Sequence, residues 1–311
     1  MVDLNIELPE SFFQEEERDG YLVTRETKEL WAVELDLLNE FDRVCKKHNL
    51  KYMLDFGTLL GAIRHKGFIP WDDDVDVSML REDYDKLMEI GSTEFSNPYY
   101  LQNISKEKNS DESVSKLRRS DTTFLLSNNV RYRTRYNQGV FIDIFVFDNL
   151  PSNDQIVIKE LREKSHQMFW HAHILAHRPG FFDGYRLPAT LIRYLMMRFR
   201  YGSSQKLQQK REQYSKQFAF SGYVGNTQSQ LTRIRPYSWF EEITNVTFEN
   251  LLLPVPVCFD EMLKECYGDY MTPVHGGAAH SVLYVDVDNP YTNVLNDDAL
   301  YKRLWLNYIK H

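Results

Sequence analysis

Cysteine is scarce in this sequence. The chain has three cysteines, Cys45, Cys258 and Cys266, which form no Cys-x-x-Cys pair and have no spacing typical of a zinc site. This absence argues against cysteine-based zinc and redox motifs. An odd number of widely spaced cysteines also favours a reducing compartment.

Long apolar runs are also missing, and so is a signal peptide. No stretch approaches the roughly 18 uninterrupted apolar residues that indicate a membrane-spanning helix. The chain begins with MVDLNIELPESFFQEEERDG, which is acidic and has neither the basic region nor the apolar region of a signal peptide. We therefore expect no export, no membrane span and a cytoplasmic location.

Excess positive charge is absent as well, because the formal net charge is −8. This argues against nucleic-acid binding by the whole surface, although local basic patches can still bind phosphates. Length and apolar content are ample: 311 residues with 42% hydrophobic residues can bury a sizeable core. One large domain, or a domain with a substantial insertion, is therefore expected.

Acidic residues are concentrated in one stretch. Residues 55–79 read DFGTLLGAIRHKGFIPWDDDVDVSM and hold four aspartates within the five positions 72–76. Polar and apolar residues alternate from Asp74 to Val77, as in a strand, so Asp74 and Asp76 are expected to point to the same side. At a rise of about 3.3 Å per residue, their carboxylates would lie roughly 6 to 7 Å apart.

Two carboxylates at that spacing repel each other unless a cation lies between them. Carboxylate oxygens suit Mg²⁺ or Mn²⁺ rather than thiophilic metals. The sequence therefore predicts a site for Mg²⁺ or Mn²⁺ that includes Asp74 and Asp76. A solvated acidic loop is the alternative, but it explains neither the alternation nor the presence of Pro70 and Trp71 immediately before the aspartates.

The residues before the aspartates predict a turn that can bind phosphate. Gly57 and Thr58 follow an expected short strand and precede an expected brief helix. Glycine lets backbone N–H groups approach a ligand closely, and a helix N-terminus favours a phosphate group. Arg64 and His65, at the basic tip of this stretch, would add positive charge for such a group.

Hydrophobic periodicity predicts the elements around this stretch. A long amphipathic helix is expected over residues 24–49, where apolar residues recur at helical spacing. Gly91 is expected to end a later helix. The other expected elements are a strand at 51–55, helices at 59–65 and 81–90, a strand or strand pair at 113–126, and a strand at 139–147.

Cations are expected near a site built for phosphates. In the stretch 113–126, Lys116 and Arg118 share one face, and residues 131–136, RYRTRY, also alternate, which would place three arginines on one side. Arginine binds phosphate oxygens in a fixed fork. Ordinary surface charge is the alternative for both runs.

The strand expected at 139–147, GVFIDIFVF, is apolar except for Asp143. A buried carboxylate without a partner is costly, so Asp143 must be paired, bound to a metal or protonated. If this strand lies beside the one that carries Asp74 and Asp76, Asp143 completes a cluster of three carboxylates.

Residues 151–221 are helical in character and contain four histidines. Neither His166 with His173 nor His171 with His177 has the i,i+4 spacing of a helical zinc pair, and no acid completes a ligand set. Packing or surface histidines are therefore favoured over a metal site. Several aromatic residues of this region are expected in the core, with a cage for a quaternary ammonium group as the alternative. They are Phe169, Trp170, Phe181 and Phe182.

The same region carries a basic patch: residues 178–211 include eight basic residues and a single acid, Asp183. The segment LIRYLMMRFRY interleaves apolar residues with arginines, a composition that suits a helix lying on an anionic membrane surface. A core-packing helix with a basic outer face is an equally good interpretation. The basic residues are Arg178, Arg186, Arg193, Arg198, Arg200, Lys206, Lys210 and Arg211.

Several segments resemble a known family. A Gly-Thr turn, Asp-x-Asp on a strand and a lone acid on a later strand follow the pattern of the nucleotidyltransferase fold. More narrowly, GTLLGAIRHKGFIPWDDDVDV closely resembles the LicD family, which includes bacterial phosphocholine transferases and fukutin-type phosphosugar transferases. Further similar segments are LDLLNEFDRVCKKHNLKY, REDYDKL, GVFIDIF and LPVPVCFDEMLKECYGDYM. The resemblance is weakest over residues 150–238, and residues 273–280 depart from the family pattern.

The resemblance implies an α/β (α+β) fold with a nucleotidyltransferase-like mixed sheet core. On this basis we expect an N-terminal extension at 1–23 and a catalytic core at 24–150. A helical insertion is expected at 151–225, and a C-terminal helical segment at 226–311 would pack back onto the core.

The resemblance also implies a metal-dependent phosphotransferase. Such an enzyme moves phosphocholine, or a related phospho-polyol, from a CDP-activated donor such as CDP-choline to a sugar hydroxyl of a cell-surface glycan or teichoic acid precursor, and releases CMP. Asp74, Asp76 and Asp143 look like its catalytic and metal-binding acids. The residues expected to bind the donor are Gly57, Thr58, Arg64, His65, Lys116 and Arg118.

The acceptor would be carried on a lipid-linked glycan precursor, which peripheral contact with an anionic membrane would bring within reach. The alternative is a catalytically silent module of the same fold that binds a cation or a basic partner. The presence of all three acids favours the enzyme.

Overall fold

The computed structural model describes residues 1–179, 187–274, 276 and 282–308. Several residues named in the sequence-based predictions lie outside this described part of the chain. They are Phe181, Phe182, Asp183, Arg186, His275 and His280.

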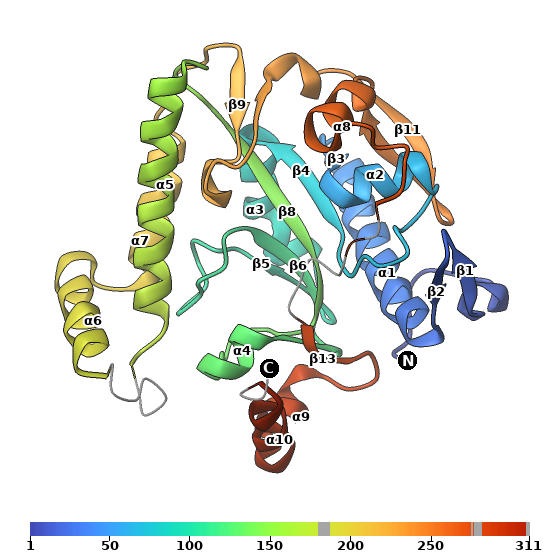
Figure 1. The fold of residues 1–311 in the computed structure, drawn as a ribbon, viewed down its shortest axis with the longest axis horizontal. Coiled ribbons are helices and arrows are strands. Elements are labelled where there is room, and N and C mark those ends of the chain that lie inside the picture. The colour runs from blue at the N-terminus through green and yellow to red at the C-terminus, as the bar shows by residue number, and fades with distance from the viewer. Residues whose placement is uncertain (180–186, 275, 277–281, 309–311) are drawn as a thin grey trace. The chain divides into compact units, whose positions relative to one another are not determined.

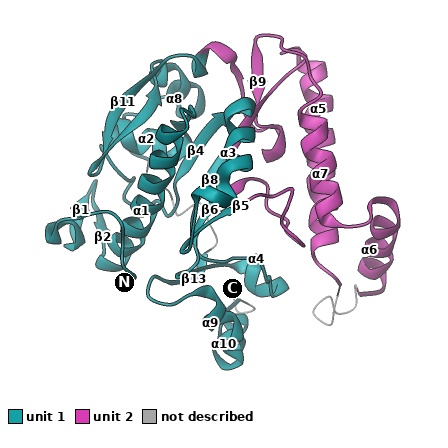
Figure 2. Ribbon diagram, turned by 180° about the vertical axis from the view of Figure 1, so that it is seen from behind, with its two compact units in different colours: residues 1–101, 116–144, 239–311 teal, residues 102–115, 145–238 magenta. Residues whose placement is uncertain are grey.

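The chain forms two compact units (Figure 2). Unit 1 comprises residues 1–101, 116–144 and 239–311, and unit 2 comprises residues 102–115 and 145–238. The stretch predicted as a helical insertion falls entirely within unit 2.

Unit 1 combines helices with a mixed sheet, which confirms the predicted α/β (α+β) fold class (Figure 1). Its helices are α1 (Arg25–Lys47), α2 (Phe56–Arg64), α3 (Arg81–Glu94), α4 (Ser127–Tyr132), α8 (Phe259–Tyr267), α9 (Tyr291–Asn296) and α10 (Asp298–Tyr308). Its strands are β1 (Glu16–Arg18), β2 (Tyr21–Val23), β3 (Met53–Leu54), β4 (Asp76–Leu80), β5 (Tyr99–Gln102), β6 (Ser115–Arg119), β7 (Thr123–Leu126), β8 (Val140–Asn149), β11 (Ile243–Phe248), β12 (Leu251–Pro256) and β13 (Val282–Asp286). Strands β5, β6 and β8 extend into residues of unit 2.

The central strands of unit 1 bring distant segments together. β3 pairs antiparallel with β4, β4 neighbours β8, β8 neighbours β6, and β6 neighbours β5. Just before β4, the carbonyl oxygen of Val75 accepts a hydrogen bond from the N–H of Asp143 at 2.8 Å. The predicted adjacency of the two acid-bearing segments is therefore confirmed.

Helix α1 is the long helix that the periodicity predicted. Thr24 caps its N-terminus by accepting a hydrogen bond from the N–H of Thr27 at 3.3 Å. Its apolar face is buried, with Trp31 and Phe41 among the largest fully buried side chains of the chain. Each such side chain contributes about 1.5 to 3 kcal/mol when it leaves water, so this face is a main source of stability for unit 1.

A C-terminal hairpin holds the turn that precedes the aspartates. Glu249 lies in the turn between β11 and β12. Its Oε1 accepts hydrogen bonds from the N–H of Phe68 at 3.1 Å and from Nη1 of Arg18 at 2.8 Å. Its own N–H donates to the carbonyl of Lys66 at 2.7 Å. Three segments that are far apart in the sequence are thus fixed around one residue.

The acidic stretch differs from the predicted strand. β4 begins at Asp76, and Asp74 lies in the irregular segment before it. Alternation of polar and apolar residues does not separate an extended loop from a strand, because both place successive side chains on opposite sides. α2 also begins earlier than predicted, so Gly57 and Thr58 lie in its first turn.

Two further segments differ from the prediction. Residues 131–136 do not form a strand, because α4 ends at Tyr132 and Arg133 is left-handed, with φ of +49°. Gly91 does not end α3, which continues to Glu94. A Cβ at Gly91 would lie 2.1 Å from Cδ2 of Leu101, so this glycine permits close packing within the helix.

Unit 2 is largely helical, as predicted. Its elements are α5 (Gln155–Ala176), α6 (Leu187–Tyr201), α7 (Ser204–Ser215), β9 (Tyr223–Gly225) and β10 (Ile234–Pro236). α5 packs against both α6 and α7, and β9 pairs antiparallel with β10 and with the end of β8. No helix among the described residues has both the length and the apolar character needed to cross a membrane.

We expect Gly61→Ala to destabilise unit 1. A Cβ at this position in α2 would lie 2.4 Å from the carbonyl oxygen of Gly67, a backbone atom with little freedom to move. The overlap should outweigh the gain of about 1 kcal/mol in helix propensity. We expect a net loss of about 2 kcal/mol or more in urea denaturation.

Gly91→Ala is the matched control for this experiment, because its new methyl group would meet the flexible end of Leu101 instead of backbone. A Gly61→Ala protein as stable as Gly91→Ala would contradict the prediction.

Candidate active site

The aspartates occupy the segment that leads into β4. Carboxylate oxygens of Asp72, Asp73 and Asp74 all lie within 4.8 Å of one another. Trp31 of α1 anchors this segment, because its Nε1 donates a hydrogen bond to the carbonyl of Asp72 at 3.1 Å. The indole is fully buried and stacks on Phe68, with ring centroids 4.6 Å apart. The apolar core of unit 1 thus fixes the backbone of an acidic loop.

Gly57 allows one of these carboxylates to lie against α2. A Cβ at Gly57 would lie 2.7 Å from Oδ2 of Asp72, so a larger residue would push the carboxylate away. The preceding residue, Phe56, is left-handed with φ of +46°, a strained conformation for a bulky side chain. Asp55 supports it by accepting a hydrogen bond from the Phe56 N–H at 2.7 Å and another from the hydroxyl of Ser78.

Thr58 positions the backbone of Asp76. Its Oγ1 accepts a hydrogen bond from the Asp76 N–H at 2.8 Å, and the Asp76 carbonyl accepts one from the Asp55 N–H at 3.1 Å. The hydroxyl that was predicted to bind phosphate is therefore engaged with the acid at the start of β4. The first turn of α2 and the start of β4 form one hydrogen-bonded unit.

Asp76 lies at the centre of an electrostatic cluster. Burial raises the pKa of its carboxyl group well above the usual value, and the charges of Asp74, Asp143, Asp72 and Asp55 raise it further, in that order. Asp76 therefore interacts with both of the other acids that the sequence singled out, Asp74 and Asp143. Asp72 and Asp55, from the same stretch, add to the negative electrostatic potential at Asp76.

Asp143 forms a buried ion pair with Lys116 of β6. The sequence left pairing, metal binding and protonation open for this acid, and the structure shows that it is paired. Lys116 Nζ also lies 3.7 Å from the ring centroid of Phe141, and the guanidinium of Arg118 lies 4.8 Å from the same centroid. Arg118 was predicted to bind phosphate. In the structure, its guanidinium donates a hydrogen bond to the carbonyl of Gly139, the residue before β8, at 2.9 Å.

The two basic residues at the end of α2 contact the terminal parts of unit 1. Arg64 Nη1 donates a hydrogen bond to the carbonyl of Tyr270 at 2.8 Å. His65 Nε2 lies 2.6 Å from Oδ2 of Asp19. Burial lowers the pKa of His65, although the hydrogen bond with Asp19 acts in the opposite direction. The structure gives both residues a role in holding the N- and C-terminal segments next to α2.

Glu34 is a site residue that the sequence analysis missed. It lies on α1, is 1% exposed, and its Oε2 has no hydrogen-bond partner in the described part of the chain. Burial raises its pKa well above the usual value, followed by the charges of Asp74, Asp73 and Asp72. The signal was present in the sequence, because Glu34 interrupts the predicted apolar face of its helix, four residues after Leu30.

The donor set of this cluster fits a hard divalent cation. The gathered donors are carboxylate oxygens, which Mg²⁺ and Mn²⁺ prefer. A cation would also relieve the repulsion that raises the pKa of Asp76, and it would compensate the buried carboxyl of Glu34. The residues present can therefore hold such an ion.

Comparison with known proteins shows which family this chain resembles. Residues 49–189 match the family described as LicD/FKTN/FKRP, nucleotidyltransferase domain. The chain is 28% identical over 258 residues to the lipopolysaccharide cholinephosphotransferase LicD of Haemophilus influenzae, and the match covers 78% of this chain and 91% of that protein. The chain is therefore similar to LicD family proteins over most of its length.

Two uncharacterized rickettsial proteins share short segments with this chain. The protein from Rickettsia prowazekii is 44% identical over 54 residues, which cover 17% of this chain and 20% of that protein. The protein from Rickettsia typhi is 47% identical over 47 residues, which cover 15% of each chain. The family match at residues 49–189 includes Asp74, Asp76 and Asp143.

We expect Asp143→Asn and Lys116→Met each to destabilise the metal-free protein in urea denaturation with EDTA present. Removing one partner leaves the other charge buried, which costs about 3 to 5 kcal/mol. The double variant should lose less than the sum of the two single losses, because neither charge remains.

The control is Asp298→Asn, since Asp298 forms an exposed pair with Arg133 that contributes at most about 1 kcal/mol. Higher stability of Asp143→Asn in EDTA would mean that repulsion from Asp76 outweighs the attraction of Lys116, contrary to the expectation.

Proposed function

We propose that this LicD-like protein transfers phosphocholine, or a related phospho-polyol, from a CDP-activated donor to a sugar hydroxyl and releases CMP. The acceptor would be a cell-surface glycan or teichoic acid precursor. The observation that carries the proposal is the buried acidic cluster around Asp76, which lies in a domain related to a lipopolysaccharide cholinephosphotransferase.

Asp74, Asp76 and Asp143 would hold Mg²⁺ or Mn²⁺, and the closeness of Asp72 to Asp74 makes Asp72 a further candidate ligand. A bound divalent cation would neutralise the charge of the donor phosphates and polarise their oxygens. Thr58 would contribute by fixing the Asp76 backbone, and Gly57 by leaving room for Asp72. These contacts preorganise acids before substrate arrives, which favours catalysis because no reorganisation is then needed.

In the reaction, an acceptor hydroxyl would attack the distal phosphorus in line and form the new P–O bond. The P–O bond to the CMP leaving group would break at the same time. Asp143 would take the hydroxyl proton or orient the base that does so, and Lys116 would hold the Asp143 carboxylate in place through their ion pair. Lys116 and Arg118 both lie near the Phe141 ring, and they would supply positive charge close to the acids.

CMP release is the decisive measurement for this proposal. We expect release from one or more of CDP-choline, CDP-ribitol and CDP-glycerol in the presence of Mg²⁺, with CDP-choline first, and its loss in EDTA. Asp76→Asn should reduce the rate by more than about 100-fold, since even changes to residues around metal ligands cost about 10- to 100-fold. Asp298→Asn is the matched control, because Asp298 forms an exposed pair with Arg133 and should retain full activity.

Near-normal turnover by folded Asp76→Asn would remove the acidic cluster from the mechanism. Binding of Mg²⁺ without CMP release from any donor would favour the silent binding module instead. If the protein acted only on UDP-sugars, it would be a glycosyltransferase and not a phosphotransferase.

Membrane docking through α6 would supply a lipid-linked acceptor. No residue of this helix is buried. Its apolar side chains are exposed, and Phe199 is 97% exposed. This pattern supports a helix that lies on a surface over one that packs in a core. The exposed apolar residues are Leu191, Ile192, Leu195, Met196 and Phe199.

We expect salt-sensitive sedimentation of the protein with anionic liposomes and none with neutral liposomes. Each basic residue near an anionic surface contributes about 1 kcal/mol, so the three arginines of α6 should give reversible binding. Changing Arg193, Arg198 and Arg200 to Glu should abolish sedimentation while leaving CMP release from a soluble donor intact.

The matched control carries the same change of charge on another helix, with Arg25, Arg43 and Lys46 of α1 changed to Glu; their side chains are 65%, 49% and 66% exposed. It should still bind. A wild-type protein that ignores anionic liposomes at low salt would exclude docking by α6.

A further inference from the structure

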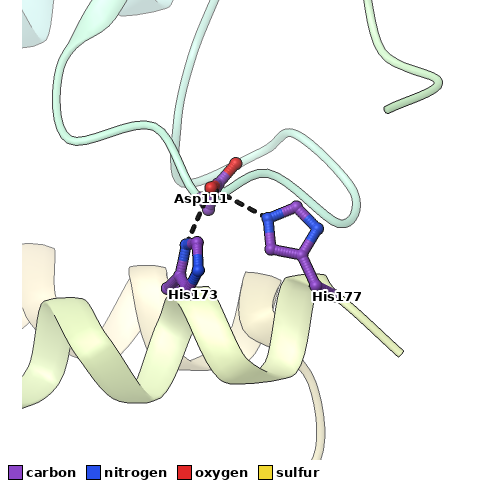
Figure 3. Close-up of side chains that lie close together, drawn as sticks. All are labelled: Asp111, His173 and His177. Atoms are coloured by element: carbon purple, nitrogen blue, oxygen red, sulfur yellow. Dashed lines mark hydrogen bonds and ion pairs between the residues drawn. The ribbon is translucent and has the colours of Figure 1, made fainter. Parts of the chain in front are cut away.

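Three metal-ligating side chains converge in unit 2, apart from the acidic cluster. His173 Nδ1 and His177 Nε2 each lie 2.9 Å from the same oxygen, Oδ2 of Asp111 (Figure 3). The three ligand atoms all lie within 4.8 Å of one another. The sequence analysis paired the histidines differently and found no acid to complete a ligand set, whereas the structure places Asp111 beside His173 and His177.

His173 and His177 are four residues apart, a spacing that places two side chains on the same side of a helix. His173 is in the last turn of α5, and His177 follows its end, with its N–H donating to the His173 carbonyl at 3.3 Å. Side chains four residues apart face each other in this way, and pairs of metal-binding histidines on helices use the same spacing. Asp111 comes from the irregular segment between β5 and β6, 62 residues before His173.

The site is shielded and rests on a packed helix. The side chains of His173, His177 and Asp111 are 18%, 9% and 17% exposed. Trp170 packs edge-on against His173, with ring centroids 5.5 Å apart. Leu175, on the same turn of α5, is buried against α7. Ligands held by a packed helix keep their geometry, which is what a metal site requires.

The distances are close to those of a bound ion. Ligand atoms bound at about 2.0 to 2.1 Å in a tetrahedral site lie roughly 3.3 Å apart. The two nitrogen-to-oxygen distances of 2.9 Å are shorter by a small amount that side-chain rotation can supply. In the metal-free protein, the imidazole N–H groups donate hydrogen bonds to the Asp111 carboxylate, and their protons lie where a metal ion would bind. Metal binding therefore competes with protonation of these nitrogens.

We propose that Asp111, His173 and His177 bind a transition-metal ion, with Zn²⁺ as the best match. Two imidazole nitrogens and one carboxylate oxygen are a donor set of intermediate softness, which suits Zn²⁺ and related ions over Mg²⁺. The site differs in this respect from the all-oxygen cluster of unit 1. A water molecule or a fourth side chain would complete the coordination.

The bound ion would fasten the irregular segment of residues 103–114 to the end of α5. This segment is also held by α7, since Gln205 donates to the carbonyl of Lys106 at 2.9 Å and Gln208 to that of Glu112 at 3.1 Å. The ion would add a third attachment, at Asp111. Its role is therefore structural, within unit 2.

Equilibrium dialysis of the full-length, chelator-treated protein against Zn²⁺, with excess Mg²⁺ present, tests the proposal. We expect one Zn²⁺ per chain and a higher melting temperature with Zn²⁺ than with EDTA. His177→Gln and Asp111→Asn should each weaken binding by more than about 100-fold. His166→Gln is the matched control on the same helix, because His166 is bonded to Trp170 and not to Asp111.

Asp76→Asn should bind Zn²⁺ like the wild type, so failure of the proposed transferase activity would not affect this result. Stoichiometric binding that persists in both His177→Gln and Asp111→Asn, or that is lost in Asp76→Asn, would overturn the proposal. Co²⁺ provides a measurement that needs no variant. The wild-type protein should show the visible absorption of a low-coordinate Co²⁺ site, and its absence would also overturn the proposal.

Discussion

Repulsion among buried carboxylates is the constraint on which unit 1 depends. An uncompensated buried charge costs several kcal/mol, and this unit places several acids around Asp76. Lys116 compensates Asp143, and a backbone N–H and a hydroxyl compensate Asp55. Asp76 and Glu34 keep raised pKa values. The order of β4, β8 and β6, and the early start of α2, are what bring each compensating group to its acid. Negative charge that a fold retains at such cost is typical of sites that bind cations or perform chemistry.

The two units collect different ligand atoms. Unit 1 gathers carboxylate oxygens on the loop before β4, whereas unit 2 combines two imidazoles with one carboxylate. Hard cations such as Mg²⁺ prefer the first set, and Zn²⁺ prefers the second. If both proposed sites bind their metals, ligand chemistry would keep the two ions at separate sites, whereas affinity alone would let the stronger binder occupy both.

The sequence predicted those features that are encoded locally or in one long motif. The helix α1, the apolar strand β8 and the grouping of Asp74, Asp76 and Asp143 all followed from periodicity or from the family resemblance. Partners that come from distant segments could not be predicted. The pairing of Lys116 with Asp143 requires β6 to neighbour β8, and the acid that joins His173 lies on another segment.

Local pattern also failed where tertiary contacts decide the structure. The alternation of residues 131–136 predicted three arginines on one side of an extended segment, yet residues 131 and 132 belong to α4. The hydroxyl of Tyr301 from α10 donates to the carbonyls of Asn129 and Val130 at the end of that helix. Glu249 has a comparable effect on the acidic loop, because it bonds Phe68, which lies 181 residues earlier. At a synthesis rate of about 5 to 20 residues per second, roughly 10 to 40 seconds separate these residues on the ribosome. The loop therefore acquires its final position late in translation, and a nascent chain that ends before the β11–β12 hairpin carries the aspartates without the contact that fixes them.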